Sequence, residues 1–280
     1  MIFLIYFFSV SFEKMGFQTA LGRIIKSLYA RGYYMDWVQL WFLPHLFVVS
    51  IYAFFFSKFF VRVNNRLIKW VALFATLFLA SIFLKNFYPF ALTLSGKAYN
   101  LYGLPFSLDL VLLSGFFFIL GGETRRGIAE STFDNLVLFF GSGAAVIILN
   151  FFFTQRIDFN TRVYESVLIN TAQAIAGIFF IIALSRQIEL HVRKLASGLT
   201  YFGRISMIIL IFHVPIQELW GKKILTATNN LPLSIWAGFV MGVAGSVLIY
   251  ELFIKANPVA SWWFGRQPEL PEQKAAPQNN

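Results

Sequence analysis

The chain has 280 residues, of which 58% are hydrophobic and only 13% are charged. A soluble domain is about a quarter charged, so a chain this poor in charge and this rich in Phe needs lipid as the solvent for much of its surface. The net charge of +10 does not indicate a nucleic-acid partner, because the basic residues lie mostly in short segments between apolar runs, where membrane topology places them. The absence of Cys excludes disulfides, thiolate metal sites and Cys nucleophiles.

The N-terminal stretch 1–12 is apolar but shorter than the roughly 17–25 residues of a membrane-spanning helix. A signal peptide would begin with basic residues and end with small residues at a cleavage site, whereas here Glu13 and Lys14 follow directly. We therefore expect this stretch to be the back half of a span whose front half is missing.

Seven further apolar stretches have the length of a span or nearly so, and the segments between them are short. Strands of a β-barrel would be about half as long and would alternate strictly, which these stretches do not. The sequence therefore predicts an all-α, polytopic transmembrane helix bundle with about seven full spans and a partial N-terminal one. The seven stretches are 37–57, 68–84, 104–121, 133–153, 166–185, 201–217 and 231–254.

The predicted membrane domain covers residues 1–264, and residues 265–280 form a tail rich in Pro, Gln and Asn that we expect to be disordered. Lys and Arg are slightly more numerous in the loops on the side of this tail than in the loops on the opposite side. The positive-inside rule therefore predicts a cytoplasmic C-terminus.

Polar residues inside spans are costly, and each is a functional candidate with a structural alternative. His213 stands beside Pro215, whose kink would free backbone carbonyls, so it could act as a general base or simply pack at a helix end. Arg204, at the start of the same stretch, could hold a phosphate or carboxylate, or extend to the membrane surface as an interfacial side chain.

The stretch that begins at residue 37 offers two more candidates. Trp41 could stack on a sugar ring or anchor the helix in the interfacial aromatic belt, and His45 could transfer protons or be a polar residue at the Pro44 kink. Asp109 is the one acid well inside a predicted span, where it could bind substrate or pair with a buried base.

Other polar residues and motifs point to structure. Asn150, Asn170 and Gln173 are expected to bridge helices, and the Gly-Ser-Gly at 141–143 to allow a close helix contact. Only three His are present, no His-Glu-x-x-His motif occurs, and no Gly-rich phosphate loop separates a strand from a helix. We therefore expect no metal.

Three segments together resemble the acyltransferase 3 family, most closely its fucose 4-O-acetylase-like branch of bacterial O-acetyltransferases. They are LWFLPHLF at 40–47, LPFSLD at 104–109 leading to GFFFILG at 115–121, and YFGRISMIILIFHVPIQ at 201–217. A weaker similarity begins at 157–164. The resemblance covers most of the chain, and the third segment is the most specific.

The resemblance implies a multi-pass protein of the bacterial inner membrane that passes an acyl group, usually acetyl from acetyl-CoA, to a sugar hydroxyl of a surface polysaccharide or glycolipid. It makes His213 the candidate catalytic residue of this chain, and Trp41, His45, Asp109, Arg204 and Gln217 candidate substrate-binding residues. Members of the family begin with a span that carries a basic residue and a His held to be catalytic. This sequence lacks that span, so we expect an N-terminal truncation or a late start of the reading frame.

Two other hypotheses stay open. A transporter or flippase of lipid-linked sugars would also need several spans with polar groups at depth. A remnant without catalytic activity would explain the incomplete N-terminus.

Overall fold

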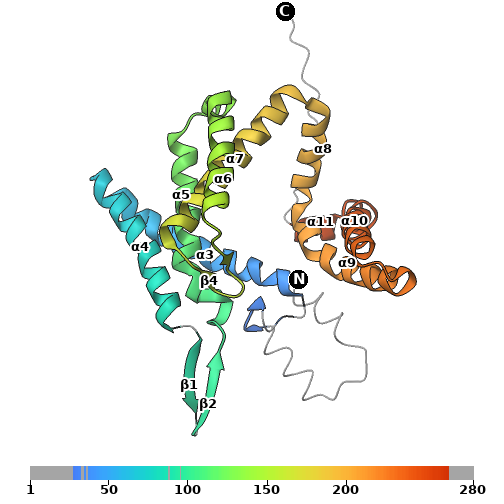
Figure 1. The fold of residues 1–280 in the computed structure, drawn as a ribbon, viewed down its shortest axis with the longest axis horizontal. Helices are drawn as coiled ribbons and strands as arrows, with labels where there is room; N and C mark the ends of the chain where they lie inside the picture. Colours follow the sequence, from blue (N-terminus) through green and yellow to red (C-terminus); the bar gives the residue numbers. More distant parts are fainter. Residues whose placement is uncertain (1–27, 33–34, 36, 88, 95, 265–280) are drawn as a thin grey trace, which may run out of the picture. The chain divides into compact units, whose positions relative to one another are not determined.

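The computed structural model describes residues 28–32, 35, 37–87, 89–94 and 96–264 (Figure 1). The predicted partial span at 1–12 and the predicted tail at 265–280 lie outside the described residues. The described part of the chain divides into two compact units, one that ends at residue 198 and one that begins at residue 199. We call them the N-terminal unit and the C-terminal unit and describe each by itself.

The N-terminal unit contains most of the described elements. In chain order they are a 3₁₀ turn (Val38–Trp41), α3 (Phe42–Arg62), α4 (Arg66–Phe87), β1 (Phe90–Leu94), β2 (Lys97–Leu101), a 3₁₀ segment (Pro105–Leu110), α5 (Val111–Gly127), a 3₁₀ turn (Glu130–Asp134), α6 (Leu136–Phe152), β3 (Ile157–Asp158), β4 (Val163–Tyr164) and α7 (Val167–His191). Helix α8 (Arg193–Arg204) straddles the boundary between the units.

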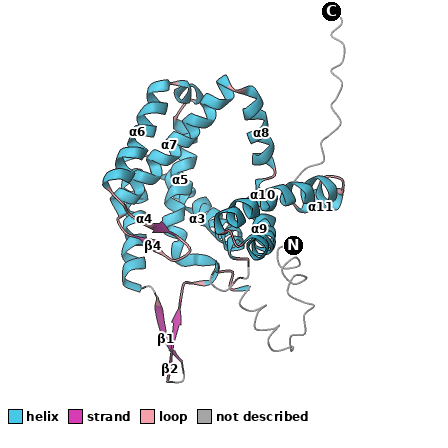
Figure 2. Ribbon diagram, turned by 45° about the vertical axis from the view of Figure 1, so that its right-hand side comes forward, coloured by secondary structure: helices cyan, strands magenta, loops and turns pink. Residues whose placement is uncertain are grey.

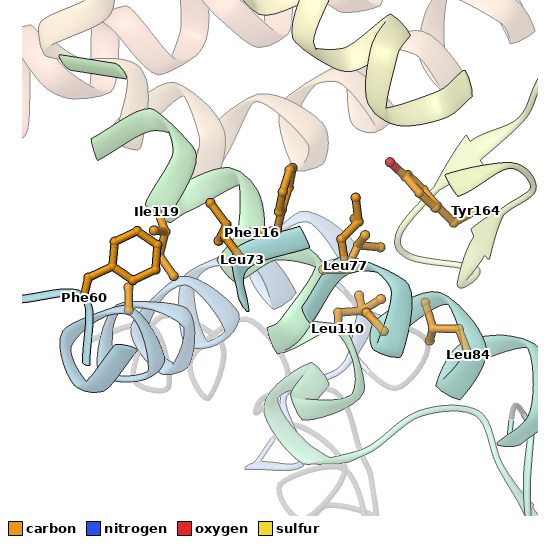
Figure 3. Packing of buried hydrophobic residues seen from close by; sticks show 11 residues of the cluster. Phe60, Leu73, Leu77, Leu84, Leu110, Phe116, Ile119 and Tyr164 are labelled. Atoms are coloured by element: carbon orange, nitrogen blue, oxygen red, sulfur yellow. The ribbon is translucent and has the colours of Figure 1, made fainter. Parts of the chain in front are cut away.

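The core of the N-terminal unit forms where α3, α4 and α5 pack together. Leu73 and Leu77 of α4 belong to one cluster with Leu113 and Phe116 of α5, and all four are almost fully buried. Figure 3 shows Leu73, Leu77 and Phe116 in this cluster. Gly115 of α5 lies directly against the ring of Tyr52, where a Cβ atom would overlap it. Small residues bring helices close in lipid, where van der Waals packing replaces the hydrophobic effect.

Helices α6 and α7 form a second packed pair. Gly143 faces the ring of Phe180, which a Cβ atom would meet at 3.0 Å, as expected for the Gly-Ser-Gly segment. The Gln173 amide of α7 donates to the carbonyls of Leu149 (3.2 Å) and Phe153 (2.7 Å) at the end of α6, so it bridges the helices. The prediction for Asn150 is wrong, because its amide donates to Val146 of its own helix at 2.8 Å.

Two short antiparallel hairpins interrupt the helices and were not predicted. Strands β1 and β2 pair from Phe90 with Leu101 to Leu94 with Lys97, and β3 pairs with β4. Gly96, in the turn between β1 and β2, has a φ of +75°, which glycine adopts without steric cost. The all-α prediction therefore holds for the spans, while the connections contain strands too short to give a periodic signal.

The C-terminal unit is built around α9 (Ser206–Thr228) and α10 (Leu231–Ile249) (Figure 2). A π-helical turn (Tyr250–Ile254) and α11 (Pro258–Trp263) follow. Between the two long helices, the Asn230 side chain caps α10 by accepting from Leu233 N at 3.0 Å. Gly242 of α10 approaches the His213 carbonyl so closely that a Cβ atom would lie 2.7 Å from its oxygen.

Five helices of the described chain are long and apolar enough to cross a membrane, and a sixth crossing results if α8 and α9, bent by 76°, count as one span. The five are Val38–Arg62, Leu67–Leu84, Pro105–Gly127, Val167–His191 and Leu231–Ile254. Helix α6 covers another predicted stretch but has only 17 residues, about 25 Å, against roughly 30 Å of hydrocarbon. The chain is a multi-pass helical membrane protein, although the structure does not reproduce the count of seven spans.

Candidate functional site

A cluster of backbone strain marks the candidate site in the N-terminal unit. Five non-glycine residues of the described chain have a positive φ, and four of them, Ala30, Phe106, Ser107 and Arg162, lie in this region. Such conformations cost about 1–3 kcal/mol each and persist only where the surroundings enforce them. Here hydrogen bonds join the strained segments, because Phe106 N donates to Tyr29 O at 2.9 Å and the Tyr29 hydroxyl donates to Gly103 O at 2.7 Å.

At the centre is a fully buried ion pair between Arg162 and Asp109. Arg162 Nε donates to Asp109 Oδ2 at 2.8 Å, and Nη2 donates to Asp109 Oδ1 at 3.1 Å and to Ser107 Oγ at 3.0 Å. Its Nη1 donates to the carbonyls of Asn160 (3.0 Å) and Phe159 (3.4 Å). These contacts use all five N–H donors of the guanidinium, so the pair is a structural lock between the 3₁₀ segment before α5 and the β3–β4 connection.

The turn that carries Arg162 is itself held by Asp158. Thr161 N donates to Asp158 Oδ1 at 3.1 Å. Burial alone would raise the pKa of Asp158, but hydrogen bonds from Thr161 and Asn160 and the charge of Arg156 lower it overall. The carboxylate therefore keeps the charge with which it accepts hydrogen bonds in this turn.

A second guanidinium lies beside the first. A Cβ atom on Gly103 would be 2.6 Å from Arg162 Nη2 and 2.7 Å from Arg31 Nε, so Gly103 leaves the space that both side chains occupy. Its φ of +126° also favours glycine. Arg31 is 2% exposed, and its Nη2 lies 3.5 Å from the Asn160 carbonyl.

His45 is held in one tautomer next to this lock. The Phe106 carbonyl can only accept, so Nδ1 of a neutral His45, 3.3 Å away, carries the proton and donates to it. His45 Nε2 then accepts from the Ser114 hydroxyl at 2.8 Å. The strained turn at Phe106 and Ser107 thus carries the carbonyl that orients the imidazole.

Trp41 and Asn160 adjoin His45 on one side. The rings of Trp41 and His45 are 5.5 Å apart and inclined by 34°, and Trp41 is only half-buried. A Cβ atom on Gly32 would clash with Asn160 Oδ1 and lie 3.1 Å from Trp41 Cδ1. The backbone of Gly32 therefore lies directly against the side chains of Asn160 and Trp41. Among the described residues, Asn160 Oδ1 accepts no hydrogen bond although it is buried. This orphan acceptor is a candidate hydrogen-bond site for a water or for a ligand donor.

Of the six predicted site residues, the structure brings together Trp41, His45 and Asp109. The other three, His213, Arg204 and Gln217, belong to the C-terminal unit. There, His213 Nδ1 lies 2.7 Å from the carbonyl of Ile209 in its own helix, Arg204 is exposed, and Gln217 is half-buried.

Several members of the cluster were not predicted. Asp109 had a buried base among its expected partners, but the sequence did not identify Arg162 as that base, since the two residues are 53 positions apart. Ser107, Ser114 and Asn160 carry no sequence signal of their own. No group of three His, Asp or Glu side chains in the described part of the chain could hold a metal ion.

The fold and the cluster define a multi-span helical membrane protein with a buried polar site at the ends of its helices. The model of the acyltransferase 3 family, described as an acyltransferase domain, matches residues 1–251. The chain therefore belongs to this family, and acyltransferase activity is the activity of the family. Searches of curated proteins and of solved structures found no significant match.

Proposed function

We propose that this protein is an O-acyltransferase of the fucose 4-O-acetylase-like branch. It transfers an acyl group, in the first place acetyl from acetyl-CoA, to a sugar hydroxyl of a bacterial surface polysaccharide or glycolipid at the inner membrane. The observation that carries the proposal is the Trp41–His45 pair, held in one geometry by the Asp109–Arg162 lock, in a chain of an acyltransferase family.

The geometry supports distinct roles for the residues in this transfer. An aromatic face such as that of Trp41 suits an apolar sugar face, and the orphan Asn160 oxygen suits a sugar hydroxyl donor. His45 Nε2 takes the proton of the acceptor hydroxyl by way of Ser114. The sugar oxygen then attacks the thioester carbonyl, the C–S bond breaks, and the thiolate of CoA takes the proton back.

The test is transfer of labelled acetyl from acetyl-CoA to alkali-labile esters in membranes that contain the protein and an extract of surface glycans. We expect His45→Gln to lower transfer at least about tenfold, since general acid–base groups contribute 10²–10⁴-fold. Trp41→Ala lowers transfer because it removes the aromatic face that the sugar packs on. Two matched variants in exposed positions, His191→Gln and Trp236→Ala, keep the native rate.

Native rates in both His45→Gln and Trp41→Ala would overturn the assignment of the site. The absence of transfer by membranes that contain the native protein would overturn the enzymatic proposal itself.

The buried ion pair also supports a second candidate, a flippase of lipid-linked sugars. Its Asp109 lies in the candidate span Pro105–Gly127, and charges within spans mark transport pathways as well as catalytic sites. The two functions differ in a deletion strain. Loss of glycan export favours the flippase, whereas loss of O-acetyl signals from a glycan that is still exported favours the acyltransferase.

A further inference from the structure

Helix α8 differs from every neighbouring helix in composition and length. Its 12 residues, RKLASGLTYFGR, contain three basic residues and no acidic one, and none of them is buried. At 1.5 Å per residue the helix is about 18 Å long, too short for a hydrocarbon core of roughly 30 Å. The chain bends by 76° between α8 and α9, so α8 does not continue the direction of α9.

The side chains of α8 separate into two faces. Leu195, Leu199 and Phe202 follow each other at spacings of four and three, which places them on one side of a helix, and each is between 42% and 49% exposed. Arg193 and Arg204 lie on the opposite side, with Ser197 and Thr200 between them. A short helix with an uncovered apolar face and a basic polar face is typical of helices that lie in a membrane interface.

Contacts within the C-terminal unit hold the end of α8 at the end of a span. The Tyr201 hydroxyl donates to Glu251 Oε1 at 2.8 Å, and Lys255 Nζ donates to Glu251 Oε2 at 2.7 Å. Glu251 belongs to the last turn of the candidate span Leu231–Ile254. Tyr201 also packs on Tyr250, so the end of α8 lies beside the C-terminal end of the candidate span Leu231–Ile254.

We propose that α8 lies in the plane of the membrane interface and binds anionic phospholipid there. Leu195, Leu199 and Phe202 insert among the upper acyl chains, while Arg193, Lys194 and Arg204 contact the phosphate groups. Anionic lipid fits this surface better than a second protein, because the charges are all of one sign and lie at headgroup depth. The proposal does not depend on the reaction that the protein catalyses.

The orientation can be measured with single labels, because the native chain contains no Cys. Spin labels are attached to Leu195→Cys, Leu199→Cys and Phe202→Cys on one face, and to Ser197→Cys and Thr200→Cys on the other, in the full protein in phosphatidylcholine–phosphatidylglycerol vesicles. We expect the first three labels to be relaxed by oxygen, which concentrates in lipid, and the other two by a water-soluble nickel chelate.

Three other outcomes would overturn the proposal. Accessibility that changes steadily from residue 195 to residue 202 indicates a helix that crosses the membrane. Access of nickel to all five labels indicates a helix in water, and protection of all five from both reagents indicates a face covered by protein.

The lipid preference is tested with a fluorophore at Leu199→Cys that is quenched by doxyl-labelled phosphatidylglycerol or phosphatidylcholine. We expect a several-fold preference for phosphatidylglycerol that falls towards one in the variant R193Q/K194Q/R204Q, since each basic residue near the surface contributes up to about fivefold. The control K222Q/K223Q, with two exposed lysines at the other end of α9, keeps the preference. An equal preference in the native protein and the triple variant would contradict the proposed role of the charges.

Discussion

At the scale of single residues, the Asp109–Arg162 pair is costly to desolvate and fixes the segments that carry the two charges. Two charges that are fully removed from solvent are stabilised only by close geometry and complete hydrogen bonding, and both conditions are met here. The pair also joins Ser107 to the β3–β4 connection, and Leu104 N donates to the same carboxylate at 3.0 Å. Asp109 therefore acts on the candidate site by positioning the turn that holds His45.

Replacing Asp109 by Asn leaves Arg162 buried without a counter-charge. We expect Asp109→Asn to lower the free energy of unfolding by about 3–5 kcal/mol. The measurement is unfolding of the detergent-solubilised protein followed by Trp fluorescence. Replacing both partners, as in D109N/R162Q, restores part of the loss because no single charge remains buried.

The chain supplies a matched control in the exposed pair of Arg156 and Asp158, whose closest atoms are 3.6 Å apart. Arg156→Gln changes the stability by less than about 1 kcal/mol, as is usual for surface ion pairs. Equal effects of Asp109→Asn and Arg156→Gln would contradict the view of Asp109–Arg162 as the lock of the site.

At the scale of helices, packed helix pairs are held together by small residues at the contact and by polar side chains that form hydrogen bonds across it. In the C-terminal unit, Gly238 and Gly242 of α10 lie on the carbonyls of Gln217 and His213 in α9. The Ser234 hydroxyl donates to the Gly221 carbonyl at 2.7 Å across the same contact. The α9–α10 contact thus rests on backbone atoms of His213 and Gln217, together with the start of the Gln217 side chain, which lies against Gly242.

The α9–α10 contact predicts different effects for two glycine substitutions. Gly242→Ala places a Cβ atom 2.7 Å from a backbone oxygen, so we expect it to destabilise the protein by about 1–3 kcal/mol through overpacking. Gly177→Ala in α7 meets no atom within 4 Å and gains up to about 1 kcal/mol of helix propensity. Thermal unfolding in detergent measures both, and a lower Tm for Gly177→Ala than for Gly242→Ala would disprove the packing argument.

At the scale of the whole molecule, the open question is how many helices cross the membrane and in which direction. The balance of Lys and Arg favours a cytoplasmic C-terminus by a narrow margin. Helix α6 decides the topology of all later elements, because its 17 residues span the hydrocarbon only if the bilayer thins around it.

Single cysteines tested with a membrane-impermeant maleimide on intact cells resolve this question. If α6 crosses and the C-terminus is cytoplasmic, we expect Thr154→Cys to be labelled from outside and Thr124→Cys only after the membrane is opened. Thr124 lies in the last turn of α5, and Thr154 lies two residues after the end of α6. Labelling of both from the same side would show that α6 does not cross.

Much of the molecule could be predicted because membrane spans have a strong and local signal. Runs of about 20 apolar residues identify helices without knowledge of their neighbours, since the backbone must satisfy its own hydrogen bonds in lipid. For this reason each of the seven predicted stretches is mainly helical in the structure. The hairpins escaped prediction because strands of two to five residues have too few alternations to show a period.

The sequence by itself determined that this protein crosses a membrane several times, that it resembles an acyltransferase, and that Trp41, His45 and Asp109 are polar exceptions within its spans. Only the tertiary structure decided which of these exceptions meet. Arg162 is 53 residues from Asp109 and becomes its partner because the β3–β4 turn returns to the 3₁₀ segment before α5. The physical reason is that hydropathy is a property of each segment, whereas the pairing of buried charges depends on which segments pack together.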